Sequence, residues 1–170
     1  MRPEFQQSAP WERGRLLARH VRASWALGTD RIDDTRLADI LHADIHSDQL
    51  TIGVKRPLGL GVRNGSPHRV KLLFHRRHHR ARRFEAARFI ADMLAAPAED
   101  HWLPTTDTAT ARQKLQRAFA AEFLCPITTL QEYLNGDLSE EAIEDAGEHF
   151  EVSSVMVRSH LANNGLLPRF

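Results

Sequence analysis

The chain has 170 residues, of which 42% are hydrophobic and 26% are charged, so it can bury a real core as one domain with at most a small appendage. Its single cysteine excludes an internal disulfide framework, and no segment has the apolar length of a secretory signal or a membrane helix, so we expect a cytoplasmic protein. The formal net charge is only +1, yet residues 69–88 carry a local charge of +7 and residues 132–151 a local charge of −8. Such segments either pair within the fold or present opposite surfaces to partners.

The first part of the chain is expected to be helical after a flexible, proline-containing start over residues 1–10. Residues 11–27 contain an apolar stripe at helical spacing, and Gly28 is placed to end that helix. The stripe consists of Leu16, Leu17, Val21 and Trp25. A second, short helix follows, with Asp33 or Asp34 as its N-cap.

The pattern then changes to that of a small antiparallel sheet over roughly residues 49–74. Residues 50–54 and 58–62 alternate like strands, and residues 70–74 supply the returning strand. Asn64-Gly65, between the last two strands, is a strong hairpin signal. The glycines form neither a G-x-G-x-x-G nor a Walker pattern, so no nucleotide site is predicted.

A central helix over about residues 77–96 follows the sheet, because apolar residues recur there at spacings of three and four. These residues are Phe84, Ala87, Ile90, Ala91 and Leu94. Arg88 and Asp92 lie four positions apart and therefore project from one surface of this helix. Pro97 stops the helix, and residues 98–108 are predicted to be a loop.

The rest of the chain is predicted to be helical, which gives an α+β fold made mainly of helices around a small antiparallel sheet. The expected helices cover residues 108–124, residues 127–134, a segment that begins at Ser139, and a segment capped by Ser153 or Ser154 that ends at Asn163. The residues expected to pack the last two helices on the core are Ile143, Phe150, Val155 and Leu161.

Two sequence strings carry a resemblance to a known family. Arg82-Arg83-Phe84-x-x-Ala87 opens the central helix, and Phe119-Ala120-Ala121-Glu122-Phe123-Leu124-Cys125-Pro126 closes the helix that follows the loop. With the order of the predicted elements, these strings resemble the ImmA/IrrE family of bacterial zinc metallo-endopeptidases. The resemblance implies a metallopeptidase-fold domain over residues 11–126, with its sheet packed on a zincin-like central helix. It also implies a helix-turn-helix-like segment over residues 127–170.

The residues that carry the family's chemistry are missing from the matching positions. The H-E-x-x-H motif, which supplies two zinc ligands and a glutamate base, aligns with Arg88-Phe89-Ile90-Ala91-Asp92, and the third ligand aligns on or near Gln113. Arginine stays protonated and cannot bind zinc, and phenylalanine cannot act as a base. Of the former metal-site positions Arg88, Phe89, Asp92 and Gln113, only Asp92 keeps a side chain that can bind a metal. We therefore expect no cofactor and no catalytic residue, although the family uses zinc.

An arginine in a former zinc site suggests how the lost positive charge is replaced. We expect the Arg88 guanidinium to occupy the metal position, to pair with Asp92 and to donate to Gln113 in a closed pocket. The alternative is that Arg88 and Asp92 form an exposed pair on the helix surface, worth only a few tenths of a kcal/mol.

The basic run around residues 75–83 is a second candidate surface for contact with a protein partner or with nucleic acid phosphates. Its candidate contact residues are Arg76, Arg77, Arg80, Arg82 and Arg83. Metal binding by His75 and His79 is not favoured, because the neighbouring arginines repel a cation. Base reading by the last helix is not favoured either, because the acidic helix before it repels phosphates. Cys125 is expected to be a buried structural thiol.

The leading hypothesis is a non-catalytic, ImmA/IrrE-like pseudo-peptidase that regulates by binding another protein. The resemblance implies a helix-turn-helix repressor, or another component of a phage, mobile-element or stress-response circuit, as that partner. One alternative is a zinc-dependent endopeptidase that cleaves such a repressor with a metal site the sequence does not reveal. Another is a nucleic-acid-binding regulator that uses the basic 69–88 surface. No membrane partner is expected.

Overall fold

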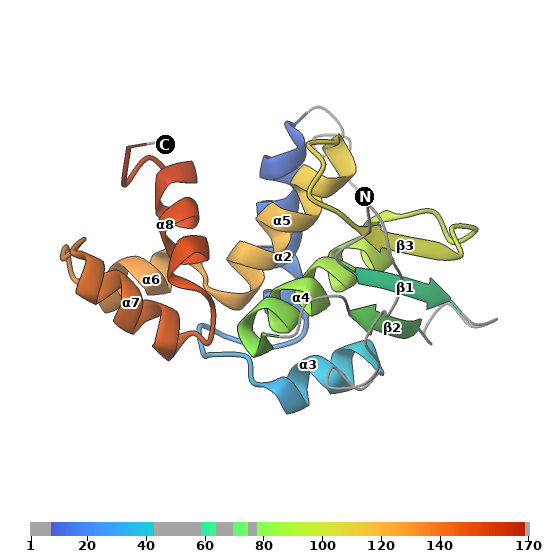
Figure 1. The fold of residues 1–170 in the computed structure, drawn as a ribbon, viewed down its shortest axis with the longest axis horizontal. Coiled ribbons are helices and arrows are strands. Elements are labelled where there is room, and N and C mark those ends of the chain that lie inside the picture. The colour runs from blue at the N-terminus through green and yellow to red at the C-terminus, as the bar shows by residue number, and fades with distance from the viewer. Residues whose placement is uncertain (1–7, 43–58, 64–69, 75–77, 169–170) are drawn as a thin grey trace.

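The computed structural model describes residues 8–42, 59–63, 70–74 and 78–168, and these residues form seven helices and three strands (Figure 1). The helices are α2 (Pro10–Ser24), α3 (Asp34–Leu41), α4 (His79–Ala95), α5 (Ala111–Leu124), α6 (Ile127–Leu134), α7 (Glu140–His149) and α8 (Ser154–Asn163). The strands are β1 (Gly59–Arg63), β2 (Val70–Phe74) and β3 (Trp102–Thr105). The fold is therefore α+β, mostly helical with a small antiparallel sheet, which confirms the predicted fold class.

Capping side chains explain where several helices begin. Asp33 accepts a hydrogen bond from the backbone N–H of Arg36 over 2.8 Å at the start of α3. Ser139 and Ser153 accept equivalent bonds at the starts of α7 and α8, over 3.2 and 3.1 Å. Each bond satisfies a backbone donor that has no partner inside its own helix. The predicted N-termini of these three helices are thus confirmed. Asp33 rather than Asp34 caps α3, and Ser153 rather than Ser154 caps α8.

Helix α2 packs along α5, and small residues set the distance between the two helices. A Cβ atom on Gly14 would lie 2.4 Å from the backbone oxygen of Leu115, so only glycine fits at this contact. Ala18 and Val21 are also buried, whereas Leu16 is 41% exposed. The predicted apolar stripe is therefore only partly right, because close backbone approach, rather than side-chain size, decides which side of α2 faces α5.

The three strands form an antiparallel sheet in the order β2-β1-β3. Gly61 of β1 lies opposite Leu72 of β2, which confirms that residues 70–74 form the predicted returning strand. The predicted strand over residues 50–54 and the Asn64-Gly65 hairpin lie outside the described residues.

Strand β3 corrects the prediction of a loop over residues 98–108. Leu103 of this strand lies opposite Gly61, so β3 adds a third member to the sheet. Its four residues include Pro104, which is typical of edge strands and weakens the strand signal in the sequence. The strand is recognisable only through its pairing with β1, about 40 residues earlier in the chain.

Helix α4 runs through the centre of the molecule and contacts α2, α3, α5 and β3 (Figure 1). Ala87, Ile90 and Ala91 of the predicted stripe are fully buried, whereas Leu94 at its end is 46% exposed. Polar residues on the other sides of the helix are buried as well. The central helix predicted from the apolar spacing is therefore confirmed, and it is buried on more than one side.

Helices α6, α7 and α8 lie together at one end of the molecule, away from the sheet (Figure 1). Ile143, Phe150 and Leu161 are almost fully buried there, as predicted. Val155 differs from the prediction, because its side chain is 71% exposed on α8. An apolar residue left in solvent on this helix becomes important for the surface described below.

The basic and the acidic segments of the sequence meet in the fold. Arg83 of α4 is fully buried and lies 3.2 Å from the carboxylate of Glu151. Arg80, one turn earlier, lies 3.8 Å from Glu148 at a more exposed place. Part of the opposite charge is therefore paired within the molecule, which is one of the two predicted alternatives.

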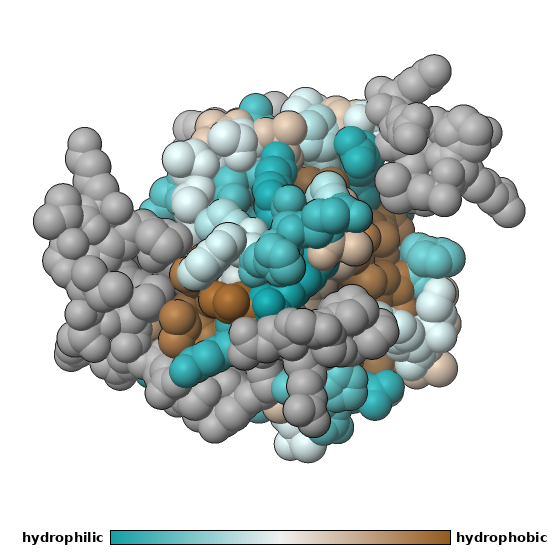
Figure 2. Space-filling view, turned by 90° about the vertical axis from the view of Figure 1, so that its right-hand side faces the viewer, coloured by the Kyte–Doolittle hydropathy of each residue, from teal (hydrophilic) through white to brown (hydrophobic). Residues whose placement is uncertain are grey.

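The described surface mixes polar and apolar areas. At the end that carries the sheet, hydrophobic areas lie on both sides of a hydrophilic band (Figure 2). Trp102 of β3 is 62% exposed. None of the helices in the described ranges is long and apolar enough to cross a membrane.

Candidate functional site

Arg88, Asp92 and Gln113, which the ImmA/IrrE resemblance aligns with zinc ligands, lie where α4 and α5 face each other. Arg88 and Asp92 of α4 both contact side chains of α5, and Gln113 stands in the first turn of α5. The exposed fractions of Arg88, Asp92 and Gln113 are 1%, 2% and 3%. The predicted enclosure of these polar side chains is confirmed, and the alternative of an exposed surface pair is wrong.

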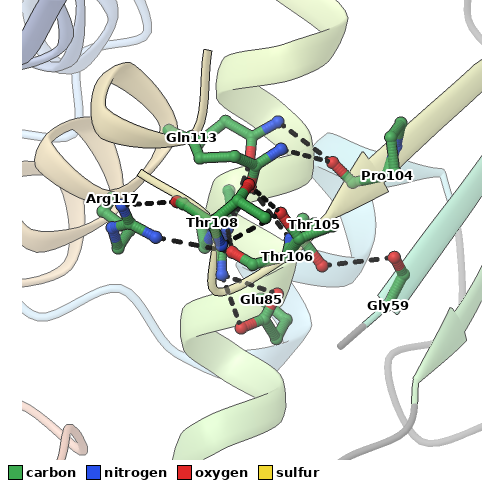
Figure 3. Close-up of polar contacts among 10 residues, drawn as sticks. Gly59, Glu85, Pro104, Thr105, Thr106, Thr108, Gln113 and Arg117 are labelled. Atoms are coloured by element: carbon green, nitrogen blue, oxygen red, sulfur yellow. Dashed lines mark hydrogen bonds and ion pairs between the residues drawn. The ribbon is translucent and has the colours of Figure 1, made fainter. Parts of the chain in front are cut away.

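The guanidinium of Arg88 is surrounded by acceptors from three parts of the chain. One terminal nitrogen donates to both carboxylate oxygens of Glu85, over 3.0 and 3.3 Å. The other donates to the carbonyl oxygen of Thr106 over 2.7 Å and to the side-chain oxygens of Gln113 and, over 3.3 Å, Gln116. Figure 3 shows Glu85 and Gln113 on opposite sides of this centre, with Thr106 between them. The charge therefore links α4, α5 and the loop between β3 and α5.

Arg88 and Glu85 form a buried ion pair, since Glu85 is only 3% exposed. Burial lowers the pKa of Arg88 from its ordinary value, and the negative charge of Glu85 opposes that shift. Because arginine stays protonated in proteins, Arg88 carries a positive charge at neutral pH. Taking two charges out of water costs several kcal/mol per ion, and hydrogen bonds to both terminal nitrogens offset that cost.

The two glutamines extend the network to the strand that precedes α5. Gln113 and Gln116 donate to the carbonyl oxygen of Pro104, over 3.1 and 3.3 Å, and Gln113 also accepts from the backbone N–H of Thr106 over 2.9 Å (Figure 3). Sequence reasoning missed Gln116 and Glu85. The signal that could have found them is spacing, because they lie three residues from Gln113 and Arg88 on the same helix faces.

Asp92 does not pair with Arg88, which corrects the predicted trio. Both oxygens of Asp92 accept hydrogen bonds from Arg112 of α5, over 2.7 and 2.8 Å. Arg112 also donates to Asp100 over 2.9 Å. The bidentate bond to Asp92 raises the pKa of Arg112. Two parallel hydrogen bonds from a planar guanidinium are stronger than a single contact with a residue on the same helix. Asp92 therefore pairs with Arg112 of α5 instead of Arg88 of α4.

Phe89, which the resemblance aligns with the family's glutamate base, packs between α4 and the sheet. It is fully buried, and its ring meets the ring of Phe74 edge to face with 5.9 Å between their centres. The tip of the ring lies 3.0 Å from where a Cβ atom on Gly59 would stand. The position therefore serves the hydrophobic core.

The side chains at this centre do not fit a zinc ion. Zinc sites in proteins use neutral histidine, thiolate or carboxylate ligands. Arg88 instead places a positive charge there, and both oxygens of Asp92 bind Arg112. In the described part of the chain, no group of three His, Cys, Asp or Glu side chains is placed to hold a metal ion.

Among the described arginines of the basic run, only some are accessible to a partner. Arg83 is fully buried and is not available to a partner, which corrects its prediction as a contact residue. The reason is that its guanidinium binds carbonyl and carboxylate groups of the protein itself. Arg80 and Arg82 are partly exposed, and Arg80 lines a cleft next to α8. Arg76 and Arg77 lie outside the described residues.

Cys125 is fully buried at the end of α5. Burial, and secondarily the nearby charge of Glu122, raise the pKa of its thiol well above the ordinary value. A thiol of this kind stays protonated and is a poor nucleophile. The predicted structural role of Cys125 is consistent with this environment.

Glu122 ties the last helix to the rest of the molecule. Its carboxylate, 2% exposed, accepts a hydrogen bond from Arg19 of α2 over 2.7 Å and lies 3.4 Å from Nε2 of His160 on α8. Burial by itself raises the pKa of Glu122, but the contacts with His160 and Arg19 outweigh burial and leave the pKa below its ordinary value. The folded state therefore favours the carboxylate form, and this form helps to hold α2, α5 and α8 together.

Glu122→Gln is expected to lower the free energy of unfolding at pH 7 by about 1–3 kcal/mol, because the buried charged acceptor of the hydrogen bond from Arg19 is lost. The stabilisation from Glu122 is fully present above its ordinary pKa of 4.5 and is lost as the pH falls through the lower folded-state pKa. The difference between wild type and variant should therefore shrink when urea denaturation is repeated from pH 7 down to acid pH. Glu141→Gln, on the exposed side of α7, is the control. It should change neither the free energy of unfolding at pH 7 nor its dependence on pH.

Compared with known proteins, the sequence matches no family model and no curated protein. The ImmA/IrrE resemblance therefore remains an expectation from the two sequence strings.

Proposed function

We propose that this protein is a non-catalytic regulatory module on an ImmA/IrrE-like scaffold, and that it acts in the cytoplasm by binding another protein. The single observation that carries the proposal is the buried guanidinium of Arg88, which stands at the position of the family's first zinc ligand and binds Glu85 and Gln113. By resemblance, the partner class is a helix-turn-helix repressor or another component of a phage, mobile-element or stress-response circuit.

The use of the former metal-site positions supports binding over hydrolysis. Arg88 holds the β3–α5 loop, Phe89 fills the core, and Asp92 holds Arg112. Each of these side chains has a structural partner, so none of the three is left to polarise water for attack on a peptide bond. The same contacts make the scaffold rigid, which suits a surface that recognises a partner.

Restoring the family's residues tests whether the scaffold is a degenerate metallopeptidase. A variant with Arg88→His, Phe89→Glu, Asp92→His and Gln113→Glu is expected to bind about one zinc ion per chain, since two histidines and a carboxylate form a typical zinc ligand set. Wild type, dialysed in the same way, should contain far less zinc by elemental analysis. A second variant that keeps Asp92 but carries the other three substitutions is the matched control and should bind zinc weakly.

The wild-type protein should also bind without cutting. Mixed with purified helix-turn-helix repressors, it is expected to form a complex on size-exclusion chromatography while the repressor keeps its full length on a denaturing gel. Stoichiometric zinc in wild type, or a shortened repressor, would overturn the non-catalytic proposal. A restored variant that folds, as judged by circular dichroism, yet takes up no zinc would overturn the scaffold assignment.

A further inference from the structure

A cleft of about 870 Å³ lies between α4 and α5 on one side and α8 on the other. The start of α2 closes one end of this cleft, and Glu85 and Arg88 form part of its base. Its volume lies in the range of specific binding pockets in proteins. The structural centre described above is therefore connected to an open surface.

The cleft has an apolar floor. Phe84, Ala118 and Met156 line it from the three helices. At its rim, Val155 and Trp11 are 71% and 47% exposed. Large apolar side chains gathered around a concave surface are typical of a binding site, because their exposure to water is unfavourable until a partner covers them.

The rim of the cleft is positively charged. Apart from the buried Arg88–Glu85 ion pair at the base, the described lining contains four arginine or lysine side chains and one carboxylate, that of Asp107. Lys114 is exposed, and Arg117 donates only to backbone carbonyls of the β3–α5 loop. Arg15 donates a hydrogen bond to the side-chain oxygen of Asn164 over 2.6 Å. Because this oxygen belongs to a neutral amide, the bond does not neutralise the charge of Arg15. The positive charge of this lining is therefore complementary to a partner that carries carboxylates.

We propose that this cleft binds an acidic peptide segment that carries bulky apolar side chains, an inference that rests on the proposed protein-binding function. The apolar side chains would cover Phe84, Met156 and Val155, and the carboxylates would pair with Lys114 and Arg117. Nucleic acid fits less well, because its phosphates would leave the apolar side chains that line the cleft uncovered. A concave surface lined by apolar side chains also suits a peptide better than a duplex.

A phage-displayed library of short random peptides, selected on the full-length protein, tests the chemistry of the cleft. The enriched peptides are expected to combine Asp or Glu with Leu, Ile, Phe or Trp. Fluorescein-labelled copies of the enriched peptides should bind Lys114→Glu and Val155→Asp at least about tenfold more weakly than wild type in fluorescence polarisation. Both substitutions lie on exposed positions, so the fold should survive them.

Two matched variants away from the cleft serve as controls. Arg36→Glu reverses an exposed charge on α3, and Leu138→Asp changes an exposed apolar residue before α7. Both should bind the peptides like wild type, and added salt should weaken binding to wild type.

Several outcomes would overturn the assignment. Failure to enrich any peptide, enrichment of basic peptides, or equal binding by the cleft variants and wild type would each contradict it. Displacement of the peptide by a labelled DNA duplex that itself loses affinity for Lys114→Glu would assign the cleft to nucleic acid instead. Peptides that bind outside the cleft would end this inference but leave the protein-binding function intact, whereas the zinc and repressor measurements test that function directly.

Discussion

Arg88→Met is expected to lower the free energy of unfolding by about 3–5 kcal/mol, the largest effect of any single substitution at the α4–α5 centre. Methionine removes the charge and leaves the Glu85 carboxylate buried without its cation. It also removes the donors to the carbonyl oxygen of Thr106 and to the two glutamine side chains. Urea denaturation of wild type and variant measures the difference.

The double variant Glu85→Gln/Arg88→Met separates the ion pair from the rest of the network. It removes both charges, so it should be more stable than the sum of the two single variants predicts, with a coupling of about 1–3 kcal/mol. Arg36→Met, which removes an exposed arginine on α3, is the control and should change stability by less than about 0.5 kcal/mol. If Arg88→Met lowered the free energy of unfolding no more than Arg36→Met does, the buried guanidinium would contribute nothing to stability.

Arg83→Met is expected to lower the free energy of unfolding by about 3 kcal/mol. It should also increase local opening of the C-terminal helices in particular. The Arg83 guanidinium binds the carboxylate of Asp34, the carbonyl oxygen of Ile32 and, over 3.1 Å, the carbonyl oxygen of Glu151. One buried side chain thus holds the start of α3 and the turn between α7 and α8 on the central helix. Its loss leaves backbone carbonyls without donors, since methionine cannot replace them.

Amide hydrogen exchange distinguishes this local effect from a general loss of stability. Exchange in α7 and α8 should increase more than exchange in α2 and α5. Arg80→Met is the matched control, because Arg80 lies on the same helix and faces the same acidic segment, but only at 3.8 Å from the exposed Glu148. A surface pair of this kind contributes about 0–1 kcal/mol, so the control should leave both stability and exchange nearly unchanged. Equal effects of the two substitutions would contradict the role given to Arg83.

Much of the helical part of the fold is predictable from local sequence. Asp33, Ser139 and Ser153 identify helix starts because each supplies an oxygen that a local backbone N–H requires. The alternation over residues 58–62 and the return over residues 70–74 likewise predict the pairing of β1 with β2. These features depend on residues within a few positions of one another, which is the range that a sequence pattern reports.

The errors concern contacts between distant segments. β3 depends on pairing with β1, and its own residues, with Pro104 among them, carry no clear strand pattern. The contact of Arg88 with Gln113 was predicted, but the pairing of Asp92 with Arg112 was not. Spacing along α4 shows that Arg88 and Asp92 share a face, but it cannot show which residue of α5 comes nearest. That choice depends on the register between the two helices.

The amides that hold Pro104 have a consequence for the behaviour of the protein in concentrated solution. In the described sheet, β3 lies at an edge, and edges of this kind can recruit strands from other molecules and start aggregation. Here, the carbonyl oxygen of Pro104 is already occupied by Gln113 and Gln116, and proline offers no N–H. The two glutamine side chains of the α4–α5 centre thus discourage intermolecular strand addition along β3.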